Sequence, residues 1–164
     1  GINVTALSKE ERTKFRLKEL GYVFQDYALL PELTALENVA IPLLMQGLQK
    51  IDAYQKSEKA LQKMGLIERL NNLPNQLSGG EQQRVSIARA IAHNPKIIFA
   101  DEPTANLDSE TADTVMKAFL ELNTLGQTII MVTHEPEYAR QTKRIVKIGN
   151  GKILSDGGPE NTPY

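Results

Sequence analysis

The sequence has no cysteine, no long apolar run and no marked excess of charge of either sign. Without cysteine, a disulfide framework, a thiolate zinc site and a cysteine nucleophile are all excluded. The net charge of -1 argues against a broad basic surface for nucleic acid. The apolar stretch 40–45 contains Pro42 and is far too short to cross a membrane, and the N-terminus does not resemble a signal peptide. These absences predict a soluble, cytoplasmic protein with no membrane span of its own.

The composition that remains is that of an ordinary globular domain. The chain has 164 residues, of which 41% are hydrophobic and 24% charged, which fits one domain with a real core. Its first residue is Gly1 rather than methionine, so we expect a processed chain, a tag remnant or a fragment.

Helical and strand patterns alternate along the chain, which predicts an α/β fold. Gly21 is expected to end the first helix and Pro42 to limit or kink the second. The apolar runs 97–100 and 128–132 are typical of strands buried on both faces of a parallel sheet. The predicted helices are 8–20, 34–39, 52–64, 78–92, 109–122 and 135–141, and the predicted strands are 22–24, 97–100, 128–132 and a hairpin at 144–154.

Polar residues stand at the exits of three predicted strands. Gln25 follows the first strand, the Asp101–Glu102 pair follows the second, and His134 follows the third. In open α/β sheets this edge binds ligands. Two adjacent acids suit a magnesium phosphate site, where one holds the metal and the other orients or deprotonates water. Two solvated acids at a strand end remain the alternative on this pattern alone.

Residues 77–83 form the second pattern with possible chemistry. Ser78 and Glu81 have the spacing of a capping box, which by itself predicts only a well-formed helix start. Gly79 and Gly80 in the first turn cost helix stability. They also expose backbone N–H groups to which a phosphate could come close. A phosphate site and an ordinary helix start are both open at this point.

Five segments in this order resemble the motifs of ATP-binding-cassette (ABC) ATPases. Residues 77–90, LSGGEQQRVSIARA, resemble the signature motif, and 97–103 resemble the Walker B strand with its adjoining glutamate. Residues 105–108 resemble the D-loop, 133–134 the H-loop and 24–25 the Q-loop. The sequence around Gln25, residues 22–44, is most similar to the lipoprotein-release and macrolide-export branch of this family.

The resemblance implies roles at a dimer interface. In the family, two subunits pair head to tail, and each signature segment meets the nucleotide that the opposite subunit mainly holds. The resemblance therefore assigns Ser78, Gly79, Gly80 and Gln82 to the γ-phosphate of the partner's ATP. It places Asp108 across the dimer interface.

The resemblance also implies a set of catalytic residues. Gln25 would sense the γ-phosphate and Mg²⁺, and Asp101 would support the Mg²⁺ ion. Glu102 would polarise the attacking water, and His134 would contact the γ-phosphate. His93 is interpreted instead as structural, because a cation suits the C-terminus of the signature helix.

The implied fold is a P-loop-NTPase-like core with a mainly parallel sheet and an α-helical lobe. The core would comprise 1–33, ending in the Q-loop, and 77–155, with the lobe at 34–76 and a loose tail at 156–164. The cofactors would be ATP and Mg²⁺. The partners would be a second ATPase subunit and a transmembrane permease, bound through the Q-loop and lobe at the inner face of the cell membrane, with no nucleic acid.

The printed sequence has no Walker A loop, G-x-x-x-x-G-K-[ST]. Its single Gly-Lys pair, 151–152, has Val146 and Ile153 where glycine and Ser/Thr are required. We therefore expect a cassette domain that lacks its N-terminal part, and that alone neither binds MgATP usefully nor hydrolyses it. Loss of the neighbouring strand would expose apolar surface and a sheet edge, which predicts self-association, domain swapping or marginal stability.

Three other interpretations follow from the same motifs. A regulatory module could complete a partner's ATP site without catalysing alone, and an in-frame P-loop upstream in the gene would argue against it. The chromosome and DNA-repair branch would need a long coiled coil between Q-loop and signature, which is absent from this sequence. The translation-factor branch would need a second cassette.

Overall fold

The computed structural model describes residues 2–160 and separates the chain into two compact units, 1–131 and 132–164. The order of helices and strands confirms the predicted α/β class. In the first unit the helices are α1 (Lys9–Glu19), α2 (Ala35–Met45), α3 (Lys50–Lys63), α4 (Gly79–Ile91) and α5 (Ser109–Thr124), with short 3-10 turns at Val4–Ala6, Ile67–Arg69 and Pro74–Gln76.

Three strands form one sheet in the order β1-β2-β3. They are β1 (Leu20–Val23), β2 (Ile97–Asp101) and β3 (Thr128–Val132), which reaches the boundary of the unit. The strands β1 and β2 are parallel, with Val23 opposite Ala100. Their carboxyl ends therefore lie at the same edge of the sheet.

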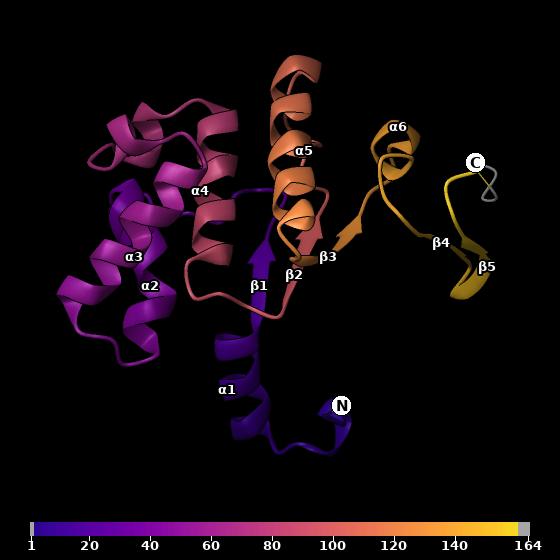
Figure 1. Cartoon of the computed structure of the whole chain (residues 1–164), viewed down its shortest axis with the longest axis horizontal. Helices are drawn as coiled ribbons and strands as arrows, with labels where there is room; N and C mark the ends of the chain where they lie inside the picture. Colours follow the sequence, from indigo (N-terminus) through magenta and orange to yellow (C-terminus); the bar gives the residue numbers. More distant parts are fainter. Residues whose placement is uncertain (1, 161–164) are drawn as a thin grey trace. The chain divides into compact units, whose positions relative to one another are not determined.

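Helix α4 lies between the sheet and the helices α2 and α3 (Figure 1). Val85, Ile87 and Ala88 have no exposed surface, because α4 packs against β1 on one side and the two helices on the other. This confirms the prediction that the helix is buried on most sides. The signature segment is thus the central helix of the unit.

Helix α2 starts at Ala35 as predicted and runs through Pro42 to Met45, so of the two expectations for Pro42 the one that it limits the helix is wrong. Thr34 caps its start, with Glu37 completing a capping box. Val39, Ala40 and Leu43 are almost fully buried on either side of the proline. Burial of these side chains outweighs the one hydrogen bond that proline removes.

Gly21 does not end the first helix, as predicted, but lies inside β1. Helix α1 already ends at Glu19, and the strand begins at Leu20. A Cβ atom built on Gly21 would overlap the carbonyl oxygen of Ala90 in α4 and lie 3.2 Å from Pro95 Cγ. The glycine is required because two backbones pass at close range here.

We expect Gly21→Ala to lower the free energy of unfolding by about 1–3 kcal/mol, because β1 must move away from α4. Gly158→Ala is the matched control, since a Cβ atom there meets no heavy atom within 4 Å and the backbone is not left-handed. Urea unfolding of the two variants measures the difference. Equal urea midpoints for Gly21→Ala and the parent would show that β1 and α4 move apart with no loss of stability.

One face of the sheet is exposed and aromatic, so the prediction that the strands are buried on both faces is wrong. Burial alternates along β2, and no residue of β3 is fully buried. Tyr22 stacks on Phe99 and on Phe24 with centroids 5.6 and 6.1 Å apart, yet Phe24 is 43% exposed. Ile130 is also exposed. The expected exposure of apolar surface is therefore present.

The second unit is built on the predicted hairpin. It contains α6 (Pro136–Ala139) and the antiparallel strands β4 (Ile145–Gly149) and β5 (Lys152–Gly157). Asn150 and Gly151 have φ of +49° and +72°, as a two-residue hairpin turn requires. The predicted loose tail at 156–164 begins too early, because Asp156 pairs with Arg144 across the hairpin at 2.6 Å. Residues 161–164 lie outside the described part of the chain.

No helix among the described residues is long and apolar enough to cross a membrane.

Candidate functional site

Gln25 and the acidic pair lie at the same edge of the sheet. Gln25 follows β1, and Asp101 ends the neighbouring parallel strand β2. The Nδ2 group of Asn106 donates to the backbone carbonyl of Gln25 at 2.9 Å. This bond joins the loop after β1 to the loop after β2. Two of the three predicted strand exits are thus held together by the protein itself.

Glu102 has an unusual backbone. Its φ is +44°, in the left-handed region that non-glycine residues seldom adopt. Asp101 before it is exposed, whereas Glu102 is half-buried and Pro103 and Thr104 after it are buried. A left-handed residue of this kind persists only where its surroundings impose it, and such residues concentrate at functional sites.

The segment after Gln25 is also left-handed. Tyr27 and Ala28 have φ of +62° and +47°. The guanidinium of Arg89 donates to both of their carbonyl oxygens, at 2.8 Å for Tyr27. Burial lowers the pKa of Arg89, and the negative charge of Asp26 opposes that shift. Arg89 in the signature helix therefore holds the Q-loop segment in its strained form.

The start of α4 is the predicted capping box. Ser78 Oγ accepts from the Glu81 backbone N–H at 3.3 Å, and Glu81 Oε2 accepts from the Ser78 N–H at 2.9 Å. The side chain of Arg69 pairs with Glu81 at 2.9 Å and, with the Ser78 N–H, lowers the pKa of Glu81. Because Ser78 Oγ accepts the helix bond, its own proton stays available to a ligand.

The two glycines of the signature segment have a packing reason as well as a chemical one. A Cβ atom on Gly80 would overlap Thr111 Cγ2 in α5, and one on Gly79 would lie 2.9 Å from the hydroxyl of Tyr27. Gln82 is half-buried and donates to the Leu77 carbonyl at 3.2 Å.

A polar cavity of about 350 Å³ opens at this end of α4. Its positive group is the side chain of Arg84, and carboxylates of Glu81 and Glu110 also reach it. The other lining residues are Ser78, Gly80, Thr111 and Thr114. Helix N–H groups and the guanidinium favour an anion such as a phosphate, whereas the carboxylate of Glu110 opposes one and that of Glu81 is paired with Arg69.

Asp108 caps α5. Its carboxylate accepts from the Thr111 hydroxyl at 2.7 Å and from the Thr111 backbone N–H at 3.0 Å. These bonds, the hydroxyl first, lower the pKa of Asp108. The side chain is exposed, so the cap fixes its position at the surface.

His134 belongs to the second unit, where it is exposed after β3. Its neighbour Thr133 accepts from the backbone N–H of Glu135 at 3.1 Å through its hydroxyl. The predicted convergence of His134 with the other two strand exits stays a prediction. Across residues 2–160, no three His, Asp or Glu side chains gather closely enough to hold a metal by themselves.

His93 is structural, but not as a cation at a helix end. Its Nε2 lies 3.1 Å from the carbonyl oxygen of Leu20 in β1. Burial lowers the pKa of His93, and the bond to Leu20 opposes that shift only in part. The neutral ring thus joins the end of α4 to β1. The predicted structural role agrees with this contact, but the reason given for it, a cation at the end of a helix dipole, does not.

Sequence reasoning missed four residues that hold the loops of this site. Arg89 and Gln83 come from α4, Asn106 from the loop after β2, and Asn38 from α2, where its side chain bonds the backbone of Leu30. Their common feature is a long or amide side chain that bonds backbone groups of a neighbouring loop, and two of them, Gln83 and Asn38, are fully buried. Such side chains indicate backbone groups that need partners.

Known proteins match this chain over nearly its whole length. A family model described as ABC transporter matches residues 2–105. An uncharacterised ABC transporter ATP-binding protein of Methanocaldococcus jannaschii is 49% identical over 94% of this chain and 69% of its own length. The lipoprotein-releasing system ATP-binding protein of Aquifex aeolicus is 47% identical over 95% of this chain and 70% of its own.

Longer relatives and solved structures agree. A macrolide export ATP-binding/permease protein of Marinobacter nauticus is 44% identical over 98% of this chain, which spans 25% of that protein. The dimeric structure of an ATP-binding cassette bound to ADP and Pi superposes with a TM-score of 0.82 at 40% identity, over 94% of this chain and 68% of that one. The chain belongs to the ABC transporter family and forms part of a nucleotide-binding ATPase subunit.

Proposed function

We propose that the chain supplies the signature side of one ATP site and the hydrolytic residues of another in a dimeric transport ATPase. The observation that carries this is the shared edge where the Q-loop and the Asp101–Glu102 loop are joined by Asn106. The end of α4 with its polar cavity supplies the second surface. One chain thus offers two complementary halves, as a head-to-tail dimer requires.

The signature half binds phosphate carried by the opposite subunit. The free N–H groups of the first turn, at Gly79 and Gly80, carry the positive end of the α4 dipole. Ser78 has a hydroxyl proton to donate, and Gln82 lies in the same turn. Arg84 adds a full positive charge to the cavity. We assign this surface to the γ-phosphate, and exposed Asp108 to contact across the interface.

We assign Gln25, Asp101, Glu102 and His134 to the hydrolytic half. Asp101 offers an exposed carboxylate and Gln25 an amide oxygen, which are ligands that Mg²⁺ accepts beside its waters. Mg²⁺ would neutralise phosphate charge there. The Glu102 carboxylate accepts a hydrogen bond from water and orients it, and His134 donates to the γ-phosphate. The left-handed backbone of Glu102 supports a role that packing alone does not explain.

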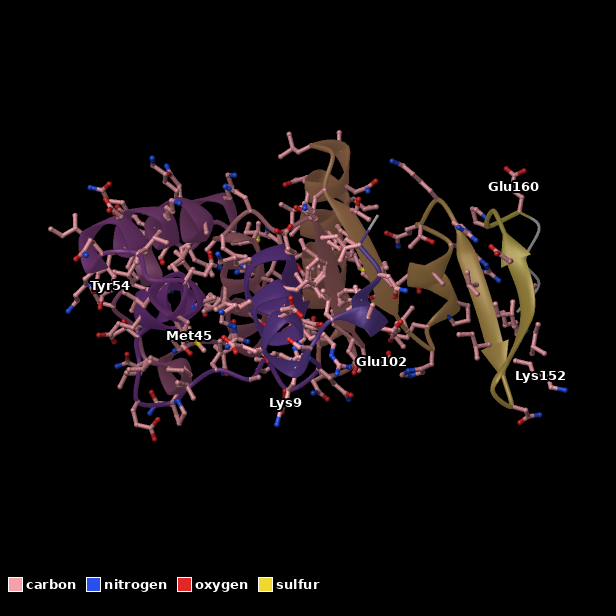
Figure 2. All side chains as sticks on the ribbon, turned by 90° about the horizontal axis from the view of Figure 1, so that it is seen from below. Lys9, Met45, Tyr54, Glu102, Lys152 and Glu160 are labelled. Atoms are coloured by element: carbon pink, nitrogen blue, oxygen red, sulfur yellow. The ribbon has the colours of Figure 1, made fainter. Side chains whose placement is uncertain are left out.

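A permease segment is proposed to dock beside the Q-loop and the helical lobe (34–76). A cavity of about 360 Å³ opens where α1, β1, α2 and α4 meet, and its surface is mainly apolar. Leu17, Phe24 and Ile41 line it with Met45, which ends α2 and is labelled in Figure 2. Arg16 also lines it, and its guanidinium suits an acidic group. Such a complex would place the subunit at the cytoplasmic face of the membrane.

The proposed division is a core of 1–33 and 77–155 around the lobe at 34–76. The similarity to both lipoprotein-release and macrolide-export proteins supports an exporter of that branch.

The test is ATP hydrolysis by a chimera in which the Walker A loop and its preceding strand, taken from the Aquifex aeolicus relative, precede Ile2. We expect Mg²⁺-dependent hydrolysis that rises steeply with protein concentration, because each site needs two subunits. The matched control is the same donor segment without residues 2–160.

The alternative function is a regulatory module that completes a partner's site without catalysing. It predicts a folded chimera that dimerises with ATP and releases no phosphate. That result would reject the hydrolytic assignment and retain the signature surface.

A further inference from the structure

Gln83 is a fully buried amide in the second turn of the signature helix. Its Nε2 group donates to the backbone carbonyl of Pro103 at 2.7 Å. The acceptor fixes which end of the amide is nitrogen, because only N–H can donate to a carbonyl. Gln83 therefore joins α4 to the residue that directly follows Glu102.

The bond gives the Pro103 carbonyl a donor, but the other end of the same amide has no partner among the described residues. Among the residues that the structure describes, none donates a hydrogen bond to Oε1 of Gln83, although that atom is buried. A buried acceptor without a donor is a cost that an apolar side chain of similar volume would avoid. Because glutamine is present at position 83 in spite of this cost, the hydrogen bond to Pro103 is the interaction that its side chain provides.

That bond reaches a short turn that also has hydrogen bonds of its own. Glu102 is left-handed at φ +44°, and proline at 103 has no N–H to donate. Within the turn, the Ala105 N–H donates to the Glu102 carbonyl at 3.3 Å and the Leu107 N–H to the Thr104 carbonyl at 3.0 Å. The carbonyl of Pro103 accepts its hydrogen bond from Gln83, which lies in α4 and not in the turn itself.

We propose that Gln83 is a positioning residue that fixes the direction of the Glu102 carboxylate by holding the Pro103 carbonyl. Gln83 follows Ser78 and Gly79 by little more than one turn of α4, so a phosphate at the start of that helix and the Glu102 turn share one rigid element. The inference rests on the proposed role of Glu102 in hydrolysis. The link itself exists without nucleotide and can be tested without it.

The experiment compares Gln83→Met with Ser86→Ala by amide hydrogen exchange in the 164-residue chain, with the carboxyl ¹³C shift of Glu102 as a second readout. Methionine has the length of glutamine and no donor. Ser86 is also fully buried on α4, so its variant controls for loss of a buried polar group on that helix. Urea unfolding gives the global stability of each variant.

We expect the amides of Ala105 and Leu107 to exchange at least tenfold faster in Gln83→Met, with a changed Glu102 shift and unchanged exchange at Ala100 in β2. Ser86→Ala should leave the Ala105 and Leu107 rates within twofold. Equal acceleration at every amide, or none at Ala105 and Leu107, would overturn the proposal. If Gln83→Met does not fold, Gln83→Leu repeats the test, and failure of both would show a role in folding instead.

Discussion

Replacing Glu102 by Gln in the chimeric cassette is expected to lower kcat for ATP hydrolysis by about 10²–10⁴-fold, the range that general-base groups contribute. The amide keeps the size of the side chain but cannot accept a proton from the attacking water. Binding of ATP should persist, because our proposal assigns the phosphate contacts to other groups. Steady-state phosphate release and equilibrium nucleotide binding measure the two effects separately.

The matched control for this variant is Glu121→Gln, which removes an exposed carboxylate from α5, away from the sheet edge. Its kcat should stay within twofold of the parent. A Glu102→Gln chimera that hydrolyses ATP at the parental rate would show that another group activates the water. A chimera that loses ATP binding as well would show that Glu102 acts in holding the nucleotide.

The helix caps and the hairpin turn could be predicted from the sequence, because each depends on residues that are close to one another in the chain. The boxes at Ser8–Glu11 and Ser78–Glu81 each form the expected pair of hydrogen bonds. The Asn150–Gly151 turn follows from the left-handed backbone that these two residue types tolerate. The order of Gln25 and Asp101 along adjacent parallel strands likewise brings them to one edge.

Contacts between distant segments could not be predicted in the same way. Glycine is needed at position 21 because the carbonyl oxygen of Ala90, about seventy positions away, leaves no room for a Cβ atom. Arg89 bonds to carbonyl groups of the Q-loop segment, which is equally distant in the sequence. Pro42 was misjudged because local propensity was weighed without the burial of α2. The exposed face of Tyr22 and Phe99 was misjudged because an apolar run alone does not reveal which faces of a sheet are covered.

The second large expected effect is the weak affinity of the 164-residue chain for MgATP. A Walker A loop supplies several backbone N–H groups and a lysine to the phosphates, and this sequence has no such motif. Hydrogen bonds to charged groups contribute roughly 1.5–3 kcal/mol each. Loss of three costs about 5–8 kcal/mol, or roughly four to six decades of affinity. Micromolar binding would weaken to between roughly ten millimolar and molar.

The most direct measurement is calorimetric titration of the purified chain with MgATP. The account predicts no detectable heat of binding up to millimolar nucleotide, because it assigns Ser78, Gly79 and Gly80 to the phosphate that another subunit holds. Clear saturable binding at millimolar concentration or tighter would contradict it. That outcome would mean that the remaining motifs, or an exchange between two copies, form a nucleotide site on their own.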